Sequence, residues 1–147
     1  MKNLKFVLLT VVAVFLFNCN SSDDSDPTIT PPPSIIDQIA HKWLLSSVID
    51  PDNGVGLPLN ECDKNGYYDF STNGNVVFES FNTESDGSCS SSILKSGTFE
   101  IGDNNGVPAV GMSYNNGDVE GYNIFSISET ELVLETSSGL HRTYVKE

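Results

Sequence analysis

Residues 68–79 read YDFSTNGNVVFE. Tyr68 and Phe70 flank Asp69 before the Asn-Gly pair, and Val76 and Phe78 stand two residues apart before Glu79 after it. This is the period-two pattern of a strand with one buried face. Asn-Gly tolerates the positive φ that a tight hairpin turn requires. The stretch therefore predicts two antiparallel strands joined by a short turn.

The same turn chemistry recurs along the chain. Further turn signals lie at residues 50–54, 103–106, 115–118 and 137–139. The segments between them are rich in aromatic and β-branched residues, which predicts strands. The expected strands are residues 42–50, 66–71, 75–82, 92–101, 107–114, 119–127, 131–136 and 140–146. A helix is expected at residues 34–40, where Ser34 suits the N-cap and isoleucines share one face.

The high strand content sets the fold class. Eight expected strands fill more than half of residues 34–147, well above the share in ordinary domains. We therefore expect an all-β domain, an eight-stranded antiparallel up-and-down barrel with a short N-terminal helix, because successive hairpins that close on themselves leave no exposed edge. A two-sheet β-sandwich is the alternative. Residues 34–147 are enough for one hydrophobic core and not for two.

The first residues predict an export signal. Two lysines precede an apolar run at residues 6–17, the layout of a secretory leader, and the run is shorter than the roughly 20 residues that span a bilayer. Residues 16–19, LFNC, resemble the lipobox of bacterial lipoproteins, in which the cysteine is lipidated and becomes the mature N-terminus. The resemblance implies that residues 1–18 are removed and that Cys19 carries fatty acyl chains such as palmitate. An ordinary leader followed by an incidental thiol is the alternative.

Residues 19–33 contain an acidic serine tract and then the proline-rich TITPPP. Such a composition buries too little apolar surface to fold, so it predicts a disordered tether between a membrane and the domain. Acidic residues directly after a lipidated cysteine also resemble the signal that sends some Gram-negative lipoproteins to the cell surface. We expect a lipid-anchored protein of the cell envelope, in the outer membrane, on the periplasmic face or the cell surface. A tether without any addressing value is the alternative.

Charge and composition exclude several partners. The chain has 7 basic and 20 acidic residues and a formal charge of −13, so nucleic acid is not an expected partner, because its affinity depends on Lys and Arg neutralising phosphates. Two histidines without CxxC or HxxxH spacing give no zinc site, and the turns lack the ligand spacing of a calcium loop. We expect no metal and no cofactor.

The chain has three cysteines. If Cys19 is acylated, Cys62 and Cys89 remain and can form one disulfide. They lie 27 residues apart (89 − 62), for which chain entropy gives roughly 3 to 4 kcal/mol of stabilisation. A Cys-His nucleophile pair is the alternative.

Three segments in a fixed order carry a family resemblance. Residues 39–47, IAHKWLLSS, follow the expected helix; residues 62–74, CDKNGYYDFSTNG, place a cysteine before an aromatic strand and a glycine turn; residues 127–134, ISETELVL, lead to RTYVK at the end of the chain. Together they resemble the bacterial lipocalin-like lipoprotein domains. In lipocalins a tryptophan on the first strand closes the barrel base under a basic side chain from the last strand. The resemblance implies these structural roles for Trp43 and Arg142. Core packing of Trp43 without an arginine cover is the alternative.

The resemblance also implies a small hydrophobic or amphipathic ligand at the open mouth of the barrel, since eight strands enclose either packed side chains or one small ligand. Aromatic residues that would line such a site are Tyr68, Phe70, Phe78, Tyr114 and Tyr122. Plain core packing is the alternative for each of them. A barrel filled with side chains would instead be a non-catalytic envelope scaffold whose acidic loops meet another protein or a glycan.

Catalysis is not expected. The sequence has no serine elbow, no zinc spacing and no phosphate-binding glycine loop. Paired carboxylates such as Glu129 and Glu131 are typical of a solvated strand edge in so acidic a chain. Acid–base chemistry by Asp69 or His141 is the catalytic alternative.

Overall fold

The computed structural model describes residues 33–147. The predicted leader, the lipidation site Cys19 and the tether up to residue 32 lie outside the described residues, so they stay predictions. In the part of the chain that is described, no helix is long and apolar enough to cross a membrane.

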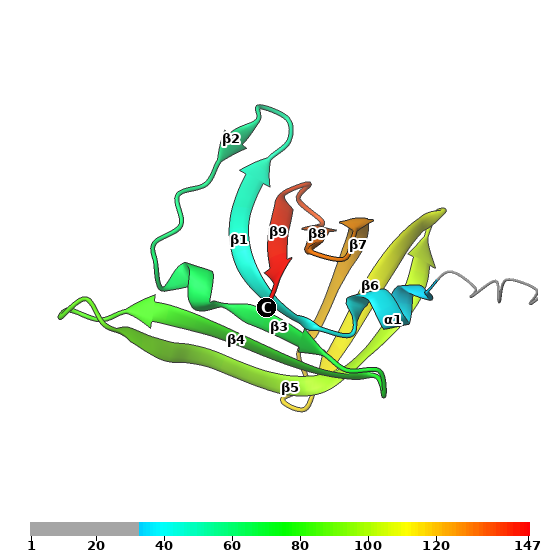
Figure 1. Ribbon diagram of the computed structural model, residues 1–147, viewed down its shortest axis with the longest axis horizontal. Coiled ribbons are helices and arrows are strands. Elements are labelled where there is room, and N and C mark those ends of the chain that lie inside the picture. Colours follow the sequence, from blue (N-terminus) through cyan, green and yellow to red (C-terminus); the bar gives the residue numbers. More distant parts are fainter. Residues whose placement is uncertain (1–32) are drawn as a thin grey trace, which may run out of the picture. The chain divides into compact units, whose positions relative to one another are not determined.

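Nine antiparallel strands and one short α-helix make up this part (Figure 1). The helix α1 (Ile35–Ile39) is followed by β1 (Lys42–Asp50), β2 (Val55–Gly56), a 3-10 turn η1 (Asp63–Asn65), β3 (Tyr67–Phe70), β4 (Asn75–Thr83), β5 (Cys89–Asn104), β6 (Val107–Tyr114), β7 (Val119–Ile127), β8 (Glu131–Glu135) and β9 (His141–Lys146). Eight of these strands match the predicted ones, and the two-residue β2 is additional. Ser34 is the N-cap of α1, as expected, and its hydroxyl accepts the Asp37 N–H at 3.1 Å.

The strands form one sheet that closes on itself. Their order is β2-β1-β3-β4-β5-β6-β7-β8-β9, and β1 also pairs with β9. The predicted up-and-down barrel is therefore confirmed, and the sandwich alternative is wrong, because one continuous sheet replaces two. The ring is uneven, since β1 pairs with β3 only over 42–44 but with β9 from Trp43 to Ile49.

The stretch at residues 68–79 forms the predicted hairpin. Phe70 pairs with Val76 across the turn, and Gly74 has a φ of +83°. Beyond the start of β3, which pairs with Glu79, β4 and β5 continue together as an arm (Figure 1), paired out to Thr83 and Cys89. The prediction made β5 too short at both ends. Its start contains serines that pair with β4, and its end, residues 102–104, contains turn-type residues that pair with β6.

One hydrophobic core fills most of the barrel. Its fully buried members include Trp43, Tyr68, Met112 and Leu132, and none of the described polar or charged residues is buried. The helix α1 closes one end of the core through Ile39, whose carbonyl oxygen accepts the Trp43 Nε1–H at 2.7 Å. Trp43 is thus a core residue under α1.

The predicted cover of Trp43 by Arg142 is wrong. The β1–β9 register places Lys146 opposite Trp43 and Arg142 opposite Val48, which is about 16 Å farther along β1 at the usual rise per residue. Arg142 lies over Tyr122 instead, with Cζ 6.0 Å from the ring centre. Trp43 and Arg142 are therefore far apart, and Arg142 lies in another part of the barrel.

Candidate functional site

A pocket of about 270 Å³ opens between β1, β4, β9 and the segment that joins β2 to β3. Its apolar walls are Leu45, Val48, Leu59, Phe78 and Phe81. Leu45 and Phe78 also pack against the core, so the pocket lies on the inner side of the sheet. Four residues with polar side chains, Asp63, Ser80, Arg142 and Tyr144, also line it, together with Gly66.

The pocket exists because β3 is short. The strand β3 ends its pairing with β1 at Leu44, so no strand lies between the later residues of β1 and β4. Residues 57–66 fill this gap as an irregular wall. The Leu57 N–H donates to the Val48 carbonyl at 2.8 Å, and the Leu45 N–H donates to the Gly66 carbonyl at 2.8 Å. These bonds satisfy backbone groups of β1 that a neighbouring strand would otherwise pair.

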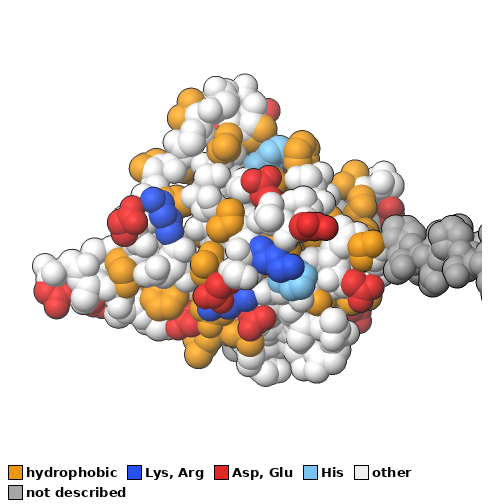
Figure 2. All heavy atoms as spheres, in the orientation of Figure 1, with side chains coloured by type: hydrophobic (Ala, Val, Ile, Leu, Met, Phe, Trp, Pro, Cys, Tyr) orange, Lys and Arg blue, Asp and Glu red, His pale blue; other side chains and the backbone are white. Residues whose placement is uncertain are grey.

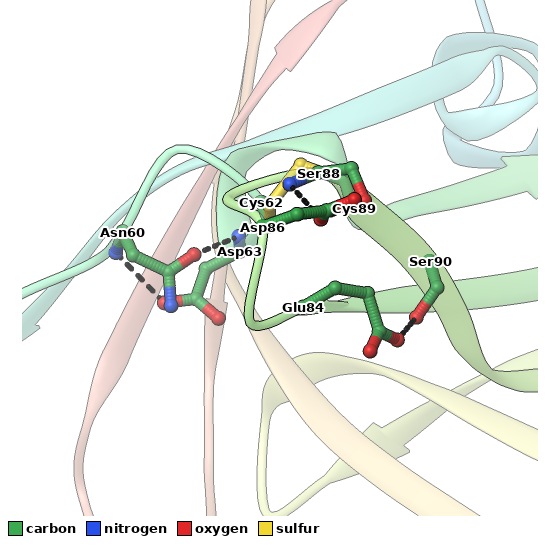
Figure 3. The surroundings of a disulfide bond; sticks show 8 residues. All are labelled: Asn60, Cys62, Asp63, Glu84, Asp86, Ser88, Cys89 and Ser90. Carbon is green, nitrogen blue, oxygen red and sulfur yellow. Dashed lines mark hydrogen bonds between the residues drawn. A yellow bond between two sulfur atoms is a disulfide. The ribbon is translucent and has the colours of Figure 1, made fainter.

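A disulfide ties this wall to the β4–β5 arm (Figure 3). Cys62, which is 2% exposed, is bonded to Cys89 at the start of β5. The predicted disulfide is confirmed. Around it, Asn60 and Asp63 exchange hydrogen bonds of 2.8 and 2.9 Å from their backbone N–H groups to each other's side chains. The wall is therefore held by a covalent bond to β5 and by hydrogen bonds within its own segment.

Local bonds also shape the tip of the arm. The Ser88 N–H donates to the Asp86 carboxylate at 2.9 Å, and the Ser90 hydroxyl donates to Glu84 across the turn (Figure 3). The hydrogen bonds from Ser88 lower the pKa of Asp86. Cys89 therefore directly follows a hydrogen-bonded turn at the tip of the arm.

Arg142 is the one basic side chain of the pocket, and it has no carboxylate partner among the described residues. Its buried Nε–H has no acceptor among residues 33–147, and no described carboxylate lies within ion-pair distance of it. Burial acts to lower the pKa of Arg142, but the neighbouring hydroxyls of Tyr144 and Tyr122 outweigh it and the pKa is raised. The guanidinium therefore stays charged.

Behind the pocket the barrel is filled by a network around Glu120. One oxygen of Glu120 accepts hydrogen bonds from Tyr68 at 3.1 Å, Tyr122 at 3.3 Å and Tyr114 at 3.4 Å. The other accepts from Lys95 at 3.0 Å. Burial is the largest cause of the raised pKa of Tyr68, so its hydroxyl stays protonated and donates.

The structure distributes the predicted ligand residues over two environments. Phe78 lines the pocket, and Tyr122 lies against the Arg142 guanidinium. Tyr68, Phe70 and Tyr114 lie in the packed core, where the Tyr68 ring is 5.5 Å from that of Phe70 and 4.9 Å from that of Phe78.

Sequence reasoning missed the role of Arg142 in this pocket. A usable signal existed, because Arg142 and Tyr144 are two residues apart on one strand and so share a face. The sequence did not show which residue of β1 lies opposite Arg142.

Another depression, of about 410 Å³, lies over β5, β6 and β7. Glu100, Asp103 and Glu135 border it, and small residues such as Gly111 and Gly121 also line it. The face shown in Figure 2 intersperses acidic, basic and hydrophobic side chains. Within residues 33–147 no cluster of side chains has the composition of a metal site.

The pocket beside Arg142 combines apolar walls with a charge that has no carboxylate partner among the described residues. We therefore take this pocket as the candidate site.

Comparison with known proteins places this architecture. Residues 39–134 match the model of the lipocalin-like domain family. A lipocalin-like protein from Bacteroides uniformis ATCC 8492 is 14% identical with a TM-score of 0.52, over 75% of this chain and 99% of that one. An uncharacterized protein from Bacteroides eggerthii DSM 20697 is 12% identical with a TM-score of 0.53, over 74% of this chain and 99% of that one. Likeness at such identities concerns the fold alone. Among curated proteins none matches the chain.

Proposed function

This chain belongs to the lipocalin-like domain family, and from that premise we propose that it holds one small hydrophobic or amphipathic ligand in the pocket between β1, β4 and β9. The observation that carries the proposal is an apolar-walled space of about 270 Å³ on the inner side of an otherwise packed barrel. Ligand sites are typically concave and mostly apolar with a few placed polar groups, and this pocket has that composition.

The size of the pocket limits the ligand. A volume of about 270 Å³ corresponds to about nine water molecules at ~30 Å³ each, and it lies just below the range of roughly 300 to 1,000 Å³ that is usual for ligand sites. A short aliphatic chain or a single ring system fits inside. A longer molecule would leave part of itself at the barrel mouth.

The proposal includes the cellular setting. We propose that Cys19 is lipidated, that the acidic tether follows it, and that the barrel acts at the cell envelope, most simply at the outer membrane, by binding and without catalysis. The support is the sequence of the leader and the tether. Metabolic labelling with a palmitate analogue tests the anchor, since Cys19→Ser should abolish the label while Cys62→Ser should retain it.

Native mass spectrometry tests ligand binding. The full chain, exported and disulfide-intact, is incubated with an envelope lipid extract and released under gentle activation. Leu59→Trp places a large ring in the pocket wall, whereas Leu57→Trp changes an exposed leucine of the same segment that does not line the pocket. We expect a one-to-one adduct with wild type and Leu57→Trp, and at least a tenfold smaller adduct fraction with Leu59→Trp. An adduct that persists unchanged in Leu59→Trp, or none with wild type, contradicts the proposal.

The filled half of the barrel supports a second function. Tyr68, Tyr114 and Tyr122 close around Glu120 and leave that region packed. A non-catalytic scaffold that meets an envelope protein or a glycan through its acidic loops would need no ligand. If wild type carries no adduct, in-cell crosslinking from the acidic loops becomes the experiment that identifies its partner.

A further inference from the structure

The pocket holds one basic side chain, Arg142. We propose that the ligand carries an anionic head group, a carboxylate or a phosphate, that Arg142 binds while the apolar part of the ligand lies against Leu59, Phe78 and Phe81. This inference rests on the proposed function, because it assigns the chemistry of the molecule in the same pocket.

The charge distribution supports an external anion. Lys42, Lys64 and Lys95 each pair with a carboxylate at 2.7–3.0 Å. Arg142 makes no such pair within the described residues, although acidic residues outnumber basic ones by 20 to 7 in the chain. Arg142 lies in a pocket on the inner side of the sheet and has no carboxylate partner. It is therefore suited to pair with an anionic group of a ligand.

The hydrogen-bond donors of Arg142 also support an anionic ligand. Its Nε–H is buried and has no acceptor among the described protein groups, and a half-buried charge is costly unless it is paired. A guanidinium offers N–H groups in a planar fork that matches two oxygens of a carboxylate or phosphate. An anionic head group would supply both the counter-charge and the acceptors.

Neighbouring side chains orient this fork. Tyr144 follows Arg142 by two residues on β9 and lines the same pocket. The Tyr122 ring also lies near the guanidinium, with its centre 6.0 Å from Cζ. Both contacts hold the planar group beside the pocket, which limits the side-chain entropy lost when an anion binds.

Asp63 is the one carboxylate that lines the pocket. Its Oδ2 accepts the Asn60 N–H at 2.8 Å, so it serves the wall and makes no ion pair with Arg142. An anion in the pocket would feel its repulsion. We therefore expect Asp63→Asn, which keeps an oxygen for the Asn60 N–H, to tighten anion binding a few-fold.

Titration calorimetry with matched eight-carbon probes tests the head group. The probes are octanoate, octyl phosphate and octanol, each titrated into the full exported chain. We expect wild type to bind octanoate or octyl phosphate at least tenfold more tightly than octanol, and the better of the two identifies the head group. Arg142→Gln should reduce this preference to less than twofold.

Lys146→Gln is the matched control. Lys146 lies on the same strand, has no carboxylate partner among the described residues and contacts His41 Nε2 at 2.9 Å instead. The variant removes the same charge outside the pocket and should keep the wild-type preference. Arg142→Lys keeps the charge without the fork and should fall between wild type and Arg142→Gln.

The outcomes separate this inference from the proposed function. Equal binding of octanol and both anions to wild type overturns the anion inference and leaves the ligand pocket standing, and this comparison needs no variant to fold. Binding of an anion that is equally weakened by Lys146→Gln also overturns it, because general electrostatics would then explain the preference. If no probe binds and Leu59→Trp changes nothing in the lipid-extract experiment, the proposed function fails, and the inference with it.

Discussion

Cys62 in the wall of the pocket and Cys89 at the start of β5 are joined by a disulfide with their Cα atoms 5.3 Å apart. The bond connects the segment that replaces a strand between β1 and β4 to the arm formed by β4 and β5. It anchors the segment whose residues Leu59, Asp63 and Gly66 line the pocket. The same bond therefore contributes to stability and to the shape of the candidate site.

Removing the disulfide should affect both properties. For a separation of 27 residues, the double variant Cys62→Ala/Cys89→Ser should lower the free energy of unfolding by about 3.5 kcal/mol. Urea unfolding followed by the fluorescence of Trp43, the single tryptophan, measures this. Octanoate affinity should fall at least fivefold, because the wall loses its anchor. Lower stability with unchanged affinity would show that the hydrogen bonds of residues 57–66 hold the wall without the bond.

Gly97→Ala should destabilise the barrel. A Cβ at Gly97 would lie 2.1 Å from the Ser113 carbonyl oxygen and 2.7 Å from the Tyr114 Cα, so β5 and β6 would have to separate. We expect a loss of about 3 kcal/mol. Gly102→Ala on the same strand is the control, because its Cβ would meet nothing within 4 Å. Thermal unfolding by circular dichroism compares the two, and similar melting temperatures would contradict the close approach of these strands.

Trp43→Phe should weaken the closed end of the barrel. Trp43 is 0% exposed and donates a hydrogen bond of 2.7 Å to the Ile39 carbonyl. The variant removes this bond and part of the buried ring, at a cost of about 2 kcal/mol. Phe125→Leu, at a side chain that is 60% exposed, should cost less than about 0.5 kcal/mol. Urea unfolding by circular dichroism measures both, and equal costs would place Trp43 outside the cooperative core.

Tyr67 should give the fold a dependence on alkaline pH. Its hydroxyl donates to Glu79 at 2.8 Å, and this hydrogen bond is the largest cause that raises the pKa of Tyr67 from 10.0 to about 12. Since the folded pKa is raised, the stabilisation is fully present below pH 10 and is lost as the pH rises through about 12. Tyrosinate absorbance measures the titration.

Glu79→Gln is the control for this titration. It removes the carboxylate and should bring the first tyrosinate absorbance of the folded protein to lower pH than in wild type. Identical titration curves for the two proteins would contradict the role of the Tyr67–Glu79 bond.

Much of the barrel was predictable because its signals are local. The bounds of β1, β6 and β7 match the predicted strands, since alternation and Asn-Gly turns act over a few residues. The strand β2 was missed because two residues show no periodicity, and only their pairing with Ile49 and Asp50 defines them. The start of β5 was missed for a similar reason, since serines there pair with β4.

The candidate site was less predictable. Alternation identified Phe78 as an inward-facing residue, and it does line the pocket. The partner of Arg142 was predicted wrongly, because the pairing of β1 with β9 places Lys146 opposite Trp43 and Arg142 opposite Val48. This register joins two strands from opposite ends of the domain, and no local pattern in the sequence specifies it.

The sequence by itself determined the strand pattern, the turns, the capped helix and the pair of cysteines that form the disulfide, because each depends on neighbouring residues or on the only remaining partner. Only the tertiary structure decided that β3 begins as late as Tyr67, that residues 57–66 replace a strand, and that Arg142 lies beside the resulting pocket without a carboxylate. These features depend on how strands distant in the chain align when the sheet closes. That alignment is set by the packing of the whole barrel and not by any one segment.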